Sequence, residues 1–154
     1  MRSVLKKLKQ KFIDFLKQGM TPSQLAKAVA LGVCIGIVPL IGSTSLLCMV
    51  VAFSFRLNMA VIQTVNYLIY PLQLLLFIPF LKIGAYIGKQ DFNYSFSDII
   101  TMLYEHPWAT IQHFFTLNMY ALLVWALIAT LLYIVLYAVF LKSFQVLAQA
   151  IQKK

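Results

Sequence analysis

The sequence reads Gly32-Val-Cys-Ile-Gly-Ile-Val-Pro-Leu-Ile-Gly42 inside an apolar run that extends from Leu25 to Phe55. Lys27 is the only charge in that run, and so long an apolar stretch predicts insertion into a membrane rather than burial in a soluble core. A proline has no amide proton and its ring clashes with the preceding turn of a helix. We therefore expect a structural break near 38–42, formed by Gly32, Gly36, Pro39 and Gly42.

The two pieces on either side of this break are short. Leu25–Val38 has 14 residues and Ser43–Phe55 has 13, so each forms about 20 Å of helix against the ~30 Å of a bilayer core. Two short arms joined by a sharp turn predict a re-entrant hairpin, which enters and leaves the membrane on one side. Broken backbone at membrane depth requires protein or a wet cavity around it, so other segments should pack over the hairpin.

Composition predicts one small integral membrane protein. The 154 residues are 62% hydrophobic and 11% charged, with a mean hydropathy of +0.85, which argues against a soluble enzyme. The net charge is +9, and seven of the thirteen Lys and Arg residues lie in the first 27 positions. Because these residues flank membrane segments, anionic lipids are the expected partner and nucleic acid is not.

The segment 1–19 predicts a basic amphipathic helix on the membrane surface. Its apolar half faces lipid, and its lipid-surface lysines are Lys6, Lys7, Lys11 and Lys17. The alternative is an ordinary helix packed on a soluble partner. Thr21-Pro22-Ser-Gln24 then opens the next helix, with a capping residue, proline at the first helical position and Gln at the third.

The rest of the chain predicts two crossings and further interfacial elements. Met59–Leu81 is long enough to cross once, with a kink or break at Tyr70-Pro71 and a second proline, Pro79. Gly84-x-x-x-Gly88 allows close helix approach. In the 96–116 region a second interfacial helix follows, kinked at Pro107, and then 117–141 crosses as a transmembrane helix before an amphipathic carboxyl-terminal tail. The predicted segments are thus 1–19, 20–90, 91–116 and 117–154.

Basic residues predict the topology. Both termini should lie in the cytoplasm and the region 90–116, which has no Lys or Arg, outside, at the bacterial inner (cytoplasmic) membrane. One re-entrant hairpin followed by one crossing satisfies this orientation. Three full crossings also satisfy it, but two of them would be unusually short. Because four short membrane elements cover the hairpin poorly, we also expect a homo-oligomer.

Polar groups at membrane depth are few. Between Asp14 and Asp91 the sequence has no Asp, Glu or His, so the usual groups of proton-coupled carriers and metal-dependent membrane phosphatases are absent. The candidate substrate-binding residues are Arg56, Asn58, Gln63, Asn66, Gln73 and Ser43, assisted by amide protons at the helix start near Gly42 to Ser45. The alternative is that Arg56 snorkels to the interface and the amides only cap broken helices.

No other pattern in the sequence predicts catalysis. Cys34 and Cys48 have no metal-ligand spacing and are expected to be buried small hydrophobes. His106 and His113, seven residues apart on an interfacial helix, do not form a metal site. We expect no metal, no cofactor and no enzymatic activity, since no nucleophile, phosphate-binding loop or dinucleotide fingerprint occurs.

The combined spacing resembles a known family. Gly32-x-x-x-Gly36-x-x-Pro39-x-x-Gly42, then Arg56-x-Asn58, Tyr70-Pro71, and Pro79 before Gly84, are similar over about 20–90 to the bacterial membrane family called domain of unknown function two thousand and sixty-two. The family usually shows Asn-Pro-Leu-Thr where this chain has Tyr70-Pro-Leu-Gln73. Some relatives follow a glycosyltransferase domain, so the resemblance implies a role near lipid-linked sugar or envelope biogenesis.

The expected fold is all-α, with a re-entrant or broken helical hairpin, transmembrane helices and interfacial helices at the amino terminus, in the 96–116 region and at the carboxyl terminus. The expected function is binding, and translocation, of an anionic lipid headgroup or related solute in a transporter-like or flippase-like protein. The alternative is a non-transporting membrane anchor or scaffold for an envelope enzyme of the glycosyltransferase type.

Overall fold

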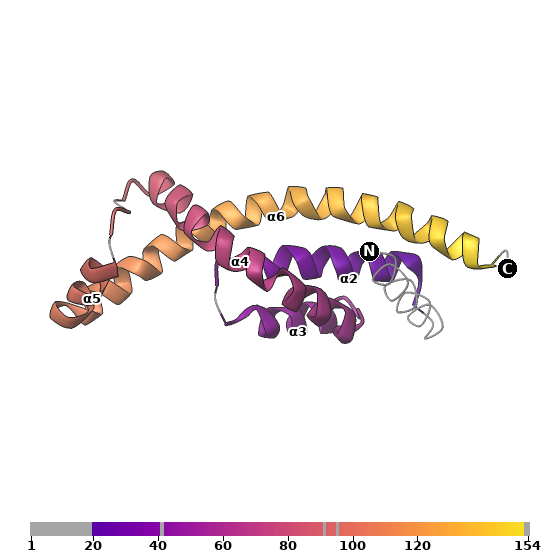
Figure 1. Ribbon diagram of the computed structural model, residues 1–154, viewed down its shortest axis with the longest axis horizontal. Coiled ribbons are helices and arrows are strands. Elements are labelled where there is room, and N and C mark those ends of the chain that lie inside the picture. Colours follow the sequence, from indigo (N-terminus) through magenta and orange to yellow (C-terminus); the bar gives the residue numbers. More distant parts are fainter. Residues whose placement is uncertain (1–19, 41, 91, 95, 153–154) are drawn as a thin grey trace.

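The computed structural model describes residues 20–40, 42–90, 92–94 and 96–152, and this part of the chain is all-α without a strand. Its five helices are α2 (Pro22–Gly36), α3 (Thr44–Ser54), α4 (Met59–Ile87), α5 (Phe96–Glu105) and α6 (Pro107–Gln152). Figure 1 shows that α6 runs along the length of the molecule, with α2 beside its carboxyl-terminal part. Helix α3 lies on the side of α2 away from α6, and α5 lies beside the start of α6. The predicted amino-terminal helix, with Lys6, Lys7, Lys11 and Lys17, lies outside the described residues.

The predicted break is confirmed between α2 and α3. Helix α2 ends at Gly36 and α3 begins at Thr44. The backbone at Gly42 has φ +87°, a left-handed conformation that glycine adopts without a steric penalty. The start of α2 is also as predicted, because Thr21 and Gln24 form a reciprocal capping box with proline in the first turn.

Gly32 and Gly36 act differently from the prediction. Both lie within α2, where they allow α4 to approach closely instead of breaking the helix. A Cβ added at Gly32 would lie 2.9 Å from the Val65 Cβ, and one at Gly36 would lie 2.9 Å from the Ile69 Cγ2. Of the predicted break residues in this stretch, only Pro39 and Gly42 lie in the break itself.

The sequence predicted a kink or break at Tyr70-Pro71, and the break is wrong, because α4 continues through Pro71 and Pro79. Each proline removes one amide donor, but both prolines are exposed while the opposite face of α4 packs against α2 and α6. That packing stabilises a continuous helix despite the lost bonds. The close approach predicted at 84–88 is confirmed, because a Cβ at Gly84 would lie 2.6 Å from the Ala121 backbone nitrogen.

Helix α6 spans parts of three segments that the sequence analysis predicted separately: the second interfacial element, the transmembrane helix and the carboxyl-terminal tail. The kink predicted at Pro107 is a break between two helices, because α5 ends at Glu105 and Pro107 begins α6, as expected for a residue whose missing amide would be unpaired at the first helical position. No glycine or proline follows before position 152, and α6 therefore continues without interruption past the predicted limits at 116 and 141. Its 46 residues extend over about 69 Å, at about 1.5 Å per residue.

Among the described residues, two helices are long and apolar enough to cross a membrane, Met59–Ile87 and Pro107–Ala150. Only 28% and 11% of their most apolar stretches are buried inside the molecule, unlike the core helix of a soluble protein. The predicted transmembrane length and composition are thus confirmed for these two helices. Large apolar side chains such as Leu68, Leu75 and Leu127 are more than two-thirds exposed, so much of the apolar surface faces outward.

Candidate polar site at the helix break

The carbonyl groups of the break are paired with side chains from distant helices. Gln73 on α4 is 1% exposed, and its Nε2 donates to the Val38 carbonyl at 2.8 Å and to the Leu40 carbonyl at 3.3 Å. These carbonyls lie beyond the end of α2, where no following turn of helix supplies amide donors. Gln73, predicted to bind substrate, therefore stabilises the break.

Helix α6 supplies two further donors. The Asn118 Nδ2 donates to the Pro39 carbonyl at 2.8 Å, and the Trp125 Nε1 donates to the Cys34 carbonyl at 2.9 Å. Sequence reasoning missed both residues, because they lie 79 and 91 positions from their partners. The one signal in the sequence was that Asn118 and Trp125 each carry a hydrogen-bond donor within an otherwise apolar predicted transmembrane helix.

The first turn of α3 has no side-chain cap. Ser43 is the N-cap residue, but its hydroxyl donates back to the Leu40 carbonyl at 3.3 Å and accepts no bond from the first turn. The first amide groups of a helix have no partner within the helix, so an uncapped start exposes donors and a partial positive charge. This is the amide-rich helix start that the sequence predicted.

Five polar side chains gather beside this helix start and are called here the polar cluster: Thr44, Ser45, Gln63, Asn66 and Tyr67. The Gln63 Nε2 donates to the Ser45 Oγ at 2.7 Å, and the Asn66 Nδ2 donates to the Thr44 Oγ1 at 3.3 Å. The amide oxygens of Gln63 and Asn66 are buried and have no partner. The Tyr67 hydroxyl lies beside Gln63 and Ser45.

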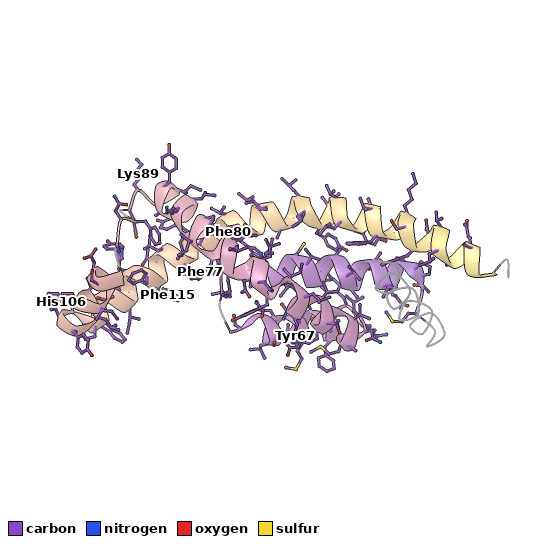
Figure 2. The ribbon with its side chains drawn as sticks, viewed as in Figure 1. Tyr67, Phe77, Phe80, Lys89, His106 and Phe115 are labelled. Carbon is purple, nitrogen blue, oxygen red and sulfur yellow. The ribbon has the colours of Figure 1, made fainter. Side chains whose placement is uncertain are left out.

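The polar cluster reaches the outer surface of the molecule. Asn66 is 3% exposed, whereas Tyr67 is 63% exposed, and Figure 2 shows Tyr67 on the α3 side of the molecule, away from α6. The neighbouring side chains Leu46 and Leu68 are apolar and exposed. The cluster is thus a small polar area, with buried acceptors behind it, on an otherwise apolar outer face.

Arg56 and Asn58 lie at the opposite end of α3. The Asn58 Oδ1 accepts from the Val61 amide at 3.2 Å and caps the start of α4. Arg56 is exposed in the turn between α3 and α4, with φ +51°. Since α3 has 11 residues, about 16 Å of helix separates Arg56 from Ser43. The predicted site residues therefore form two groups rather than one pocket.

The end that holds Arg56 is basic. Leu57 and Val61 pack with Leu25 at the start of α2 and with Phe144 and Leu147 near the end of α6. This contact brings the exposed cations Lys27, Arg56 and Lys142 to one end of the molecule. Lys82 and Lys89 lie at the other end of α4, and Lys89 is labelled there in Figure 2.

The remaining candidate residues are two cysteines and two histidines, which lie apart from the polar cluster. Cys34 and Cys48 are free and buried, as predicted. The His113 Nε2 lies 3.1 Å from the Tyr94 hydroxyl, and His106 is exposed. A hollow of about 230 Å³ lies on the first turns of α6 and is lined by Trp108, Ile111, Gln112 and Phe115.

These observations define an all-α protein with two potential transmembrane helices and a helix break stabilised by side chains. The chain belongs to the family described as uncharacterized protein conserved in bacteria (DUF2062), whose model matches residues 5–150. This confirms the family resemblance and extends it from about 20–90 to almost the whole chain. No curated protein and no solved structure matches it.

Proposed function

We propose that the chain is an integral protein of the bacterial inner membrane that binds and translocates an anionic lipid headgroup during envelope biogenesis. The observation that carries the proposal is the polar cluster, which combines an uncapped helix start with buried, unpaired amide oxygens on an apolar outer face. Polar groups in a lipid environment are costly unless a partner satisfies them. A headgroup that passes along this face would provide that partner.

The proposed topology keeps the re-entrant hairpin. Helices α2 and α3 have 15 and 11 residues, about 22 and 16 Å, too short for the ~30 Å hydrocarbon core. Both short helices have one end at the basic end of the molecule, which we assign to the cytoplasmic side. Helix α4 then crosses outward and α6 returns, so that both termini are cytoplasmic. Homo-oligomerisation would cover the exposed face of the hairpin.

Arg56 is proposed as the first contact for the headgroup. Its exposed guanidinium lies at the interfacial end of α3 and can form a planar, two-pronged contact with a phosphate. The polar cluster is the second contact, about 16 Å farther into the membrane along α3. The two groups of predicted site residues would thus act in sequence along one face, not together in one pocket.

A vesicle assay tests this function. The purified protein is reconstituted into vesicles with a tail-labelled fluorescent anionic phospholipid, and a membrane-impermeant reductant then bleaches only the label it reaches. Exchange of lipid between leaflets should exceed that of protein-free vesicles. Arg56→Lys and Gln63→Met should slow it, Arg56→Lys by roughly tenfold, since a hydrogen bond to a charged group contributes about 1.5–3 kcal/mol.

The matched control is Thr64→Val, because Thr64 is exposed on the same turn of α4 and its hydroxyl bonds only to the Ala60 carbonyl. Exchange no faster than in protein-free vesicles would reject translocation. Full activity of Arg56→Lys would restrict Arg56 to anchoring the turn.

The alternative function is a membrane anchor or scaffold for an envelope enzyme. The aromatic-lined hollow at Trp108 and Phe115, at the end of the molecule far from Arg56, favours this alternative because aromatic side chains are frequent in protein interfaces. Purification in mild detergent distinguishes the two functions. A bound phospholipid or polyprenyl phosphate supports headgroup binding, whereas a stoichiometric protein partner without lipid supports the scaffold.

A further inference from the structure

Two acceptors of the polar cluster have no hydrogen-bond partner. The Gln63 Oε1 and the Asn66 Oδ1 are both buried without a partner, while the nitrogen of each amide already donates to Ser45 or Thr44. An amide oxygen accepts hydrogen bonds and cannot donate them. A ligand that pairs with these two oxygens must therefore present a donor, which an ionised phosphate diester does not have.

The same cluster also offers donors, because it includes Thr44 and Ser45, the first two residues of the uncapped α3, and because its hydroxyl groups can donate. No Lys or Arg side chain belongs to the cluster, and Arg56 is at the other end of α3. Neutral donors and neutral acceptors side by side suit a hydroxyl group, which donates to one partner and accepts from another. A fully charged group suits this environment less well.

We infer that the polar cluster recognises the hydroxyl groups of a polyol or sugar headgroup, and that the ligand is a hydroxylated anionic lipid. This inference rests on the proposed function and specifies the ligand at the same site. In this arrangement the phosphate first contacts Arg56 at the interface, and Gln63 and Asn66 accept hydrogen bonds from the polyol after the headgroup has moved along α3. Lipids whose phosphate carries only an alkyl group would leave both amide oxygens unpaired.

The test compares two lipids of equal charge. Phosphatidylglycerol carries hydroxyl groups beyond its phosphate, and phosphatidylmethanol carries none. The full-length protein is equilibrated in vesicles that contain both lipids in equal amounts in a phosphatidylcholine background. It is then extracted in mild detergent, and the lipids that remain bound are quantified by mass spectrometry. We expect enrichment of phosphatidylglycerol over phosphatidylmethanol by about three- to tenfold, the effect of one or two hydrogen bonds.

Gln63→Met and Asn66→Leu, which keep the approximate side-chain volume, should reduce this ratio toward one, whereas Thr64→Val should leave it unchanged. Because Asn66 is buried, Gln63→Met, at a half-buried position, provides the test if Asn66→Leu fails to fold. Equal binding of both anionic lipids by the unmutated protein would overturn the inference and leave anionic headgroup binding intact. Binding of neither lipid above phosphatidylcholine would overturn the proposed function as well.

Discussion

At the scale of single residues, Gln73 and Arg56 were both predicted to bind substrate but lie in different surroundings. Gln73 is buried and donates to two carbonyls of the break, whereas Arg56 is exposed in a left-handed turn. Gln73 thus contributes to stability, and Arg56 is free to contact lipid at the basic end. Substitutions at these two positions separate folding from binding.

Replacement of Gln73 by Leu should lower the free energy of unfolding by about 1–3 kcal/mol, because the Val38 and Leu40 carbonyls each lose the hydrogen bond from the Gln73 Nε2. Gln145→Leu is the matched control, since Gln145 is exposed on α6. Unfolding in detergent, followed by circular dichroism, measures the difference. Equal stability of the two variants would show that the break does not depend on Gln73.

At position 56, Gly should be more stable than Ala by about 1 kcal/mol, because a Cβ is unfavourable at positive φ. Both substitutions remove the charge, so both should reduce binding to anionic vesicles to the same extent. The pair therefore separates backbone conformation from lipid contact, with thermal unfolding as one measurement and vesicle sedimentation as the other. Greater stability of the Ala variant would contradict the left-handed turn.

At the scale of the elements, helix packing through glycine determines how α4 meets its neighbours. Gly32 and Gly36 of α2 contact α4 on one side, and Gly84 of α4 contacts the backbone of α6 on the other. Small residues let helices approach closely when no hydrophobic effect between helices drives association in lipid. Helix α4 is therefore held between α2 and α6 mainly by shape.

Gly84→Ala should destabilise the protein by about 1–3 kcal/mol, because the added methyl group meets backbone atoms that cannot move aside. Gly42→Ala should cost about 1 kcal/mol, since no atom lies within 4 Å of an added Cβ and only the positive φ opposes it. Chemical unfolding of both variants in the same detergent gives the comparison. A larger loss for Gly42→Ala would reject the close contact between α4 and α6.

Local sequence patterns predicted the elements better than their connections. Pro39 and Gly42 located the break, and Thr21 with Gln24 located the start of α2, because caps and breakers act within a few residues. The predicted break at Tyr70-Pro71 is absent from α4, because the packing that stabilises the opposite face of this helix cannot be seen in the local sequence. Asn118 and Trp125 were missed for the same reason, because their bonds to the break depend on how α6 lies beside α2.

At the scale of the whole molecule, the described cations lie at two ends with apolar helices between them. Lys27, Arg56 and Lys142 are exposed at one end, and Lys82 and Lys89 are at the far end of α4. This distribution suits a chain whose ends meet the two surfaces of a membrane and whose centre meets hydrocarbon. The proposed orientation rests on the amino-terminal basic residues of the sequence.

Cysteine probes at Asn93, Lys142 and Ser43 test this orientation with an impermeant thiol reagent applied from outside. Asn93→Cys should react, Lys142→Cys should not, and Ser43→Cys should not react if the hairpin is re-entrant. Reaction at position 43 would favour three full crossings instead. Cys34 and Cys48 are buried and should give little background in the unmutated protein.

The hydrogen bond from Trp125 to the Cys34 carbonyl also gives the protein an intrinsic fluorescent probe of the contact between α6 and α2. The chain has two tryptophans, one hydrogen-bonded to the Cys34 carbonyl and half-buried, the other, Trp108, 78% exposed near the start of the same helix. Replacing Trp108 by Phe leaves a single indole, whose emission depends on its contact with the break. Its wavelength and quenching would then follow any separation of α2 from α6 while lipid binds, without an attached dye.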